Sequence, residues 1–331
     1  MCRILLVVAL LLAPTTDSGE PEKARRKPPE SGASVQLQAL AGADPAGEQV
    51  LTAGGSAPGG GTIVYVLDPR KQEFLAYSTG RSGVRLRGVR TISWDLLPDE
   101  VQPGERRLSV SDLKKAAPDA DPSQIERRFL LESASTRDGK SWAFVLDAAQ
   151  RVLAVYAVDA QGVRLAGSRH LRWDLVPQEI EPGGRRFSVE EMKRRSEGLP
   201  AARAADALLL AAGPTPTGRP VAYVLDPRRG KLVCYSLGRG GIELRGVRTV
   251  GWDLLPDSVD PRGRRLTTAE MKKRADGRGP VVSKLWRLVV ARTVGGGAEV
   301  HLIDAEHGKL AAYTVDSRGI RLNGVQTFER R

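Results

Sequence analysis

Short apolar runs separated by tight turns dominate the chain from residue 48 onward. One stretch illustrates the pattern, with apolar-rich runs at 129–133, 142–146, 151–158 and 163–173. Turns of Asp, Ala, Gln and Gly separate the last three runs. Runs rich in Val, Leu, Tyr and Phe that are joined by such turns predict antiparallel hairpins. The pattern therefore predicts a four-stranded β-meander.

This pattern occurs four times. The second run of each meander reads V-Y-V-L-D-P, A-F-V-L-D-A, A-Y-V-L-D-P and V-H-L-I-D-A, beginning at Val64, Ala143, Ala222 and Val300. A Trp-Asp-Leu string follows the first three meanders, whereas the fourth has Phe328-Glu329 and the chain stops at Arg331. The strings recur every 78 or 79 residues. This repetition predicts tandem units, which we place at 48–126, 127–205, 206–284 and a truncated 285–331.

A helix is predicted after each of the first three meanders. Ser188-Val189-Glu190-Glu191 and Thr267-Thr268-Ala269-Glu270 are capping boxes, and Ser109 with Asp112 forms a variant. The fold class is therefore mainly β, with four tandem antiparallel β-meander units joined by three short capped α-helices. Such units could form propeller-like blades, separate beads or a stacked array.

Residues that every copy keeps are expected to support the unit. An aspartate ends each second strand, where its carboxylate suits an Asx-type turn. These residues are Asp68, Asp147, Asp226 and Asp304. A glycine opens each fourth strand, and another lies in its middle, where it indicates a bulge or a close backbone contact.

The fourth strand alternates apolar and polar residues. Without a bulge, Val84, Leu86, Gly88 and Arg90 share the core face, and a bulge at Gly88 would exchange the faces beyond it. An arginine on the core face needs a partner. The repeated arginines are Arg90, Arg169 and Arg248, with Gln326 in the last copy. We expect each to pair with the second-strand aspartate of its own unit; the alternative is an anion-binding arginine in each copy.

Repeated aromatic residues have two interpretations. Each third strand carries a tyrosine, and the tryptophans of the Trp-Asp-Leu strings are Trp94, Trp173 and Trp252. Periodic aromatics in β-repeats favour a core role, whereas an exposed row would make a platform for sugars or bases. We expect the core role.

The combined pattern V-L-D … Y … G-[VI]-x-L-x-G-x-R … W-D-L resembles tandem repeats of uncharacterised exported bacterial proteins. The resemblance covers roughly residues 48–331 and implies no known activity. Although Trp-Asp invites comparison with WD40 repeats, those have a period of about 40–45 residues and a Gly-His element that is missing here.

The N-terminus predicts export. Arg3 precedes an apolar run from Ile4 to Ala13, which matches a signal peptide and is shorter than the roughly 20 residues of a membrane span. We place the signal at 1–18, with an uncleaved anchor as the alternative, and a flexible linker at 19–47. Cleavage would leave Cys234 as the single cysteine, so no internal disulfide is expected. The localisation would be periplasmic, cell-surface or extracellular.

The formal net charge of +12 comes mainly from arginine. Part of it matches the codon bias of a GC-rich genome, but the fourth strands are also net basic. A row of outward arginines could follow a polyanion. The candidate anion-binding residues are Arg85, Arg87, Arg164 and Arg245.

Catalytic patterns are weak in this sequence. The three histidines fall at unmatched positions, no metal-ligand spacing occurs, and no glycine-rich stretch opens a helix. We therefore expect no cofactor and no metal, and an exported noncatalytic binding or scaffolding module. The alternatives are an envelope-associated polyanion-binding protein that uses the arginine rows, and an enzyme with an Asp–Arg site between units. The partner is unknown; a protein or an anionic polymer of the envelope fits, and no nucleic-acid motif is present.

Overall fold

The structure is a computed structural model that describes residues 49–57, 61–80, 83–124, 128–136, 138–200, 208–215, 217–293 and 297–328. The predicted signal peptide and linker lie outside the described residues. None of the described helices is long and apolar enough to cross a membrane.

Each unit folds into an antiparallel sheet whose four main strands follow chain order, as predicted. The first sheet contains β1 (Leu51–Ser56), β2 (Thr62–Asp68), β3 (Glu73–Gly80) and β4 (Gly83–Thr91). The second contains β6 (Phe129–Ser135), β7 (Ser141–Asp147), β8 (Val152–Asp159) and β9 (Gly162–His170). The third contains β11 (Leu209–Pro214), β12 (Pro220–Asp226), β13 (Lys231–Gly238) and β14 (Gly241–Thr249). The fourth contains β16 (Trp286–Arg292), β17 (Ala298–Asp304), β18 (Lys309–Asp316) and β19 (Gly319–Thr327).

A fifth strand links each sheet to the unit before it. The short strands β5 (Glu100–Val101), β10 (Glu179–Ile180) and β15 (Ser258–Val259) come from the connections that follow the first three sheets. Each pairs with the last strand of the next sheet, namely β9, β14 and β19. The second, third and fourth sheets thus have five strands, and the first has four. No sequence pattern predicted these added strands, because two residues are too few to produce one.

A bulge divides every fourth strand. In β4 the pairing runs Ala76 with Gly88 but Tyr77 with Leu86, so that one extra residue lies between. The same shift occurs in the other three sheets. The faces therefore exchange, and Arg90 lies on the face opposite Leu86. The arrangement without a bulge, which placed both on one face, was wrong.

The mid-strand glycine also permits close packing between sheets. A Cβ added at Gly88 would lie 2.7 Å from the backbone nitrogen of Val163, at the start of the next unit's fourth strand. At Gly246 the corresponding distance to Ile320 would be 3.0 Å. A side chain at either position would force neighbouring sheets apart.

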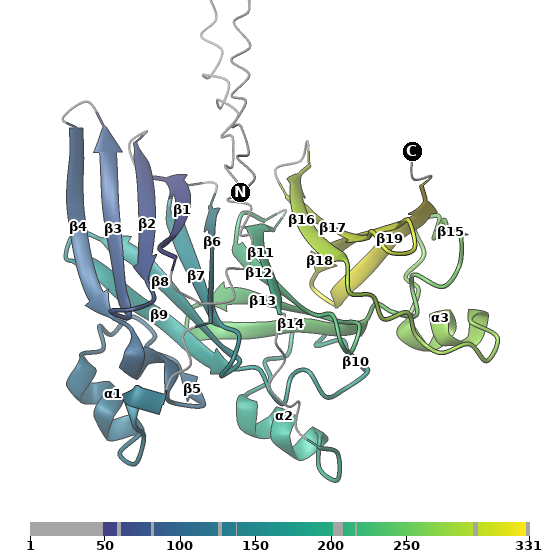
Figure 1. Ribbon diagram of the computed structural model, residues 1–331, viewed down its shortest axis with the longest axis horizontal. Coiled ribbons are helices and arrows are strands. Elements are labelled where there is room, and N and C mark those ends of the chain that lie inside the picture. Colours follow the sequence, from purple (N-terminus) through teal and green to yellow (C-terminus); the bar gives the residue numbers. More distant parts are fainter. Residues whose placement is uncertain are drawn as a thin grey trace, which may run out of the picture. The chain divides into compact units, whose positions relative to one another are not determined.

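The core lies between consecutive sheets. One cluster combines Tyr65 and Phe74 of the first sheet with Val145, Tyr156 and Leu165 of the second. Two further clusters join the second sheet to the third and the third to the fourth. Among the described elements, substantial contacts join each sheet to its neighbour in sequence, and none joins the first sheet to the fourth. Figure 1 shows the sheets following one another from purple to yellow.

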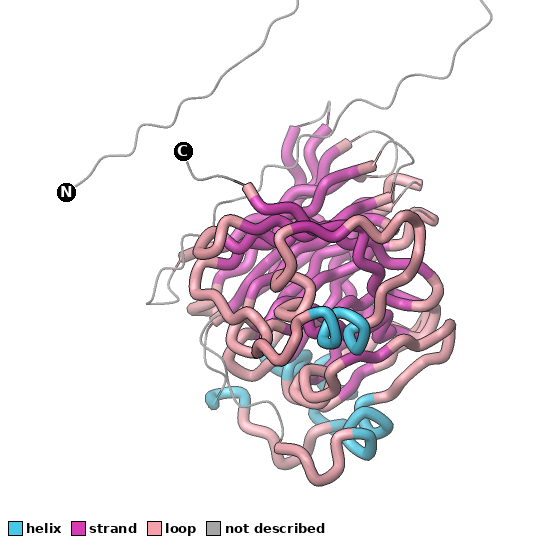
Figure 2. Tube along the Cα trace, turned by 90° about the vertical axis from the view of Figure 1, so that its right-hand side faces the viewer, coloured by secondary structure: helices cyan, strands magenta, loops and turns pink. Residues whose placement is uncertain are grey.

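The three predicted helices are present and lie outside the strands (Figure 2). They are α1 (Val110–Ala116), α2 (Val189–Arg195) and α3 (Thr268–Arg274), and short 3₁₀ helices cover Ser93–Leu96 and Pro122–Gln124. Both bonds of the capping box form at α1 and α3. At α2 the Ser188 side chain accepts from Glu191 N, and the Glu191 carboxylate pairs with Arg185.

Candidate functional site

The second-strand aspartates cap turns, as predicted. The Oδ1 atom of Asp147 accepts from the backbone nitrogens of Ala149 and Gln150, each at 3.0 Å. Asp68, Asp226 and Asp304 accept the equivalent pairs of backbone bonds. These carboxylates therefore have a local structural role.

The predicted partner of the repeated arginines was wrong. Arg169 forms a bidentate pair with Asp174, the aspartate of the Trp-Asp-Leu string, at 2.7 and 2.8 Å. Both side chains are fully buried. Arg90 with Asp95 and Arg248 with Asp253 form the same pair. The bulge explains the error, because it places the arginine on the face of the sheet opposite to the one that simple alternation predicts.

The repeated tyrosine joins neighbouring units through this aspartate. The Tyr235 hydroxyl donates to Asp174 Oδ2 at 2.8 Å, and so the third unit completes a charge pair of the second. Tyr156 donates to Asp95 and Tyr313 to Asp253 in the same way. These three tyrosines are fully buried, as the core interpretation predicted. Burial and the neighbouring aspartate raise the pKa of each hydroxyl well above its ordinary value. The network is a structural junction, with every group engaged.

The tryptophans of the Trp-Asp-Leu strings lie at the margin of the core. Trp252 is 9% exposed, while Trp94 and Trp173 are half-buried and pack against their clusters. A cation lies over each ring, supplied by Lys114, Arg172 and Lys272 respectively for Trp94, Trp173 and Trp252. They are packing residues rather than a row of exposed platforms.

The candidate anion-binding arginines do not form one row. Arg85 and Arg87 are exposed on β4. Arg164 on β9 is 26% exposed and lies 3.4 Å from Asp159, and Arg245 on β14 lies 3.9 Å from Glu243. Since Glu243 occupies the position of Arg85 and Arg164, the repeat itself interrupts the row.

Arg164 lies in a cleft that draws on three units. The cleft has a volume of about 440 Å³. Its lining includes Arg107 from the first unit, Trp142 and Arg164 from the second, and Leu237 and Arg239 from the third. We call it the Trp142 cleft. The Arg164 guanidinium lies 5.7 Å from the centre of the Trp142 ring, a cation–π distance.

The charges of the Trp142 cleft favour an anion. Arg107 donates to Asp159 at 3.1 Å and to the carbonyls of Gln161 and Val163. Arg164 approaches the same carboxylate, so two guanidinium groups share one acid. Arg239 is exposed and forms no ion pair within the described residues. The equivalent of Asp159 in the third unit is Gly238, and the carboxylate of Glu243 lies against this glycine.

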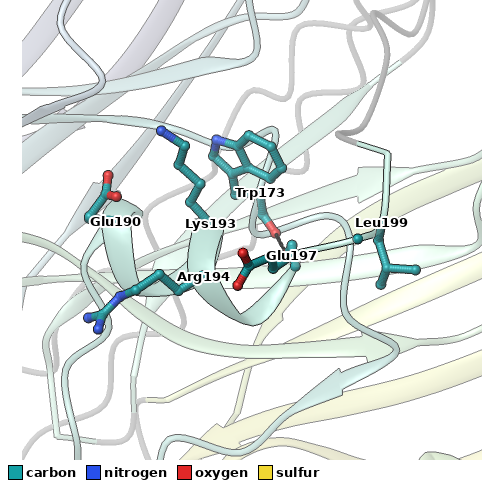
Figure 3. Close-up of a pocket in the computed structure, with 8 residues that line it drawn as sticks. Trp173, Glu190, Lys193, Arg194, Glu197 and Leu199 are labelled. Carbon is teal, nitrogen blue, oxygen red and sulfur yellow. Dashed lines mark hydrogen bonds between the residues drawn. The ribbon is translucent and has the colours of Figure 1, made fainter.

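A second, smaller pocket lies beside helix α2 (Figure 3). It has a volume of about 270 Å³ and lies within one unit. Trp173 stands above the helix, with Lys193 on one side and Leu199 on the other. Glu190 and Glu197 balance Lys193 and Arg194, so this pocket favours neither sign of charge. The Trp142 cleft is the better candidate.

Reactive groups are few among the described residues. Cys234 is fully buried, and burial raises the pKa of its thiol. No group of three or more His, Cys, Asp or Glu side chains is placed to hold a metal in the described part of the chain. Burial lowers the pKa of His170 to about 4.

Sequence reasoning missed Trp142. The other units have Ile63, Val221 and Glu299 at its position. A comparison that looks for residues shared by all copies therefore overlooks it. An aromatic residue where the other copies lack one was the available signal. Arg107 and Arg239 were missed because they lie in connections that only folding brings together.

No protein-family model matches the chain, and no curated protein matches it. A solved structure named "putative 6-phosphogluconolactonase", from Bacteroides uniformis, aligns with 85% of this chain and 69% of its own at 10% identity, with a TM-score of 0.36. A protein of the same description from Bacteroides fragilis aligns over 85% and 68% at 10% identity, with a TM-score of 0.35. A functionally unknown protein from Desulfotomaculum acetoxidans aligns over 80% and 66% at 12% identity, with a TM-score of 0.31. Similarity at this level supports no inference about activity.

Proposed function

We propose that this β-repeat protein is an exported, noncatalytic binding module that takes an anionic group of its ligand into the Trp142 cleft. The observation that carries the proposal is the convergence of Arg107, Arg164 and Arg239, from three successive units, beside one aromatic ring. Arginine offers a planar fork of donors that suits carboxylate, sulfate or phosphate. An aromatic ring adds an apolar surface for the rest of the ligand.

The distribution of the other charges supports a binding role rather than catalysis. The buried aspartates of the junctions are each engaged by an arginine and a tyrosine, and the second-strand aspartates cap turns. In the Trp142 cleft the carboxylates are Glu105 and Asp159, and Asp159 is held by two arginines. A general acid or base needs a carboxyl group free to exchange a proton with substrate. Glu105 is exposed, but among the described residues of the lining no second acid or base stands beside it apart from the arginine-bound Asp159. The three arginines and the aromatic ring therefore favour binding by charge and shape.

Retention of the full chain on immobilised heparin, over a salt series, tests the proposal. We expect retention that falls linearly on a double logarithmic plot against salt. Replacing both Arg164 and Arg239 by glutamine should reduce the slope by about two, which is one for each lost contact. The matched control replaces Arg219 and Arg318, two arginines outside the cleft, and should retain the wild-type slope.

Two results would contradict the cleft. Flow-through of the wild-type chain at low salt would mean that the positive charge has no anionic partner of this class. Equal losses in the cleft variant and the control would mean that heparin senses only net charge. A loss confined to a variant lacking Arg85 and Arg87 would favour the exposed arginines of β4 as a polyanion surface.

A further inference from the structure

The first sheet lacks three things that every other sheet receives from the unit before it. The first is a fifth strand, because the sheet ends at β4 whereas β9, β14 and β19 each pair with an added strand. In the second unit this strand is Glu100–Val101, which pairs with Arg169 and Ser168. The equivalent residues of β4 are Arg90 and Val89. Among the described residues nothing pairs with the outer edge of β4, which is therefore a template for another strand.

The second missing element is an apolar cover. Val84 and Leu86 of β4 are 70% and 55% exposed, and Val89 is 50% exposed. The equivalents of Val84 and Leu86 in the second sheet, Val163 and Leu165, are 5% and 0% exposed. The sequence thus keeps apolar residues on β4 at positions that are buried in the other units. Exposed apolar patches of this kind mark interaction sites.

The third missing element is a set of polar partners. Tyr77 is half-buried and has no hydrogen bond within the described residues, whereas its equivalents each donate to an aspartate of the preceding unit. Arg169 forms an ion pair at 3.1 Å with Glu100 of the preceding unit, and Arg248 forms the equivalent pair with Glu179. In the described part of the chain, Arg90 bonds within its own unit, to Asp95 and the Leu108 carbonyl. Its side chain keeps 10% exposure, against 0% for the other two arginines.

A single stretch supplies all three elements at the internal junctions. Between the first and second units it is residues 92–101, I-S-W-D-L-L-P-D-E-V. Its Asp95 accepts from Tyr156, its Glu100 pairs with Arg169, and Glu100–Val101 forms the added strand. Ile92 and Leu96 join the core cluster that contains Val163 and Leu165.

We propose that the outer edge and face of β4 are a docking site for a partner protein that presents a segment of this kind. The segment is acidic and apolar, with an aspartate for Tyr77, a glutamate for Arg90 and a β-branched residue for the new strand. Residues 92–101 carry three acids and no base. A glutamate of the segment would meet Arg90, as Glu100 meets Arg169 at the internal junction, so the charges are complementary. Binding would be strand addition at a sheet edge, with the apolar face giving specificity.

A second copy of this chain fits the site less well than a separate partner. The segments of this type in the first three units are already bound within the array, as β5, β10 and β15 show. The fourth unit has Gln326 where the first three have arginine, and its Phe328 lies at the position of Ile92, Leu171 and Val250. The docking face therefore continues an interface that the molecule uses internally but has no free complement among the described residues.

A fluorescent peptide with the sequence of residues 92–102, titrated into the full chain, tests the proposal. We expect saturable binding, measured by anisotropy, with hydrogen-exchange protection of the backbone amides of 83–91. Leu86→Glu should weaken binding at least about 30-fold by placing a charge on the apolar face. Leu285→Glu is the matched control, since Leu285 is 56% exposed elsewhere, and should bind like the wild type.

A double-mutant cycle tests the tyrosine. Tyr77→Phe should weaken binding about 10- to 100-fold, the value of one hydrogen bond to a charged acceptor. A peptide with asparagine in place of its Asp95 equivalent should lose a similar factor, and the two losses should not add.

Three outcomes would overturn the proposal. The first is no saturable binding, the second is protection outside β4, and the third is equal weakening by Leu86→Glu and the control. Sedimentation showing a dimer that Leu86→Glu dissociates would overturn it in favour of a second copy. Binding of the peptide is independent of the Trp142 cleft, so loss of heparin retention in the Arg164 and Arg239 variant leaves this test unaffected.

Discussion

The first and fourth sheets end the array in opposite ways. The outer face of the fourth sheet carries a polar network, in which Asn323 donates to Glu299 at 2.6 Å and accepts from Thr314. His301 lies 3.5 Å from the same glutamate. The outer face of the first sheet instead carries Val84, Leu86 and Val89. Repeat arrays need polar outer faces on their terminal units. The C-terminal unit is thus built as an end, and the N-terminal unit is built like an internal unit.

The internal junctions show what the N-terminal face lacks. Equivalent residues lie in a closed junction in one unit and on an open surface in another. The same substitution at both positions therefore measures how much the junction contributes to the free energy of unfolding.

The largest effect is expected at a buried charge pair. Asp174→Asn should lower the free energy of unfolding by about 3–5 kcal/mol, because it leaves Arg169 buried without its counter-charge. Asp257→Asn is the control, since that side chain is 95% exposed. Urea denaturation measures both, and a cost near that of the control would mean that the pair does not hold the second and third units together.

Truncation of one repeated leucine should differ between the closed and open faces. Leu165→Ala should cost about 2–5 kcal/mol, the range for a fully buried leucine. Leu86→Ala, at the equivalent position, should cost less than about 0.5 kcal/mol. Thermal and urea unfolding of the two variants provide the comparison. Equal costs would show that Leu86 is covered in solution.

Tyr235 and Tyr77 allow a third comparison between a closed junction and the open face. Tyr235→Phe should cost about 1–3 kcal/mol, because it removes a buried donor from Asp174. Tyr77→Phe should be close to neutral in the free protein. A large cost at Tyr77 would indicate that its hydroxyl already has a partner.

The last comparison between equivalent positions concerns pH. Thr91, Thr249 and Thr327 occupy the position of His170 in the other units. Burial lowers the pKa of His170 to about 4 from 6.5. The unfolded chain then takes up the proton first as pH falls, so stability is lost between about pH 6.5 and 4. We expect a loss of about 1–3 kcal/mol in that window, and Thr in place of His170 should remove it. An unchanged profile in this variant would assign the acid sensitivity to other groups.

Local patterns predicted much of this fold. Capping residues placed the helices, and the second-strand aspartates and the turn glycines placed the hairpins, because each acts on neighbouring backbone. The partner of Arg169 was mispredicted, since a single extra residue in the strand reverses every face beyond it. Glu100 and Tyr235 act across units, and no local pattern records such a contact. Comparing copies would have shown that tyrosine, arginine and the Trp-Asp string occur together in each of the first three units.

The hydrogen bond from each tyrosine to the preceding aspartate spans 61, 61 and 60 positions along the chain. During synthesis, Asp95 is made before its hydrogen-bond donor Tyr156. The interval is about 3–12 s at ordinary elongation rates of roughly 5–20 residues per second. We therefore expect the units to fold in order from the N-terminus, with each unit packing onto the one already formed. The fourth unit has Gln326 in place of the arginine, so it lacks the guanidinium that holds the aspartate for the next tyrosine at the other junctions.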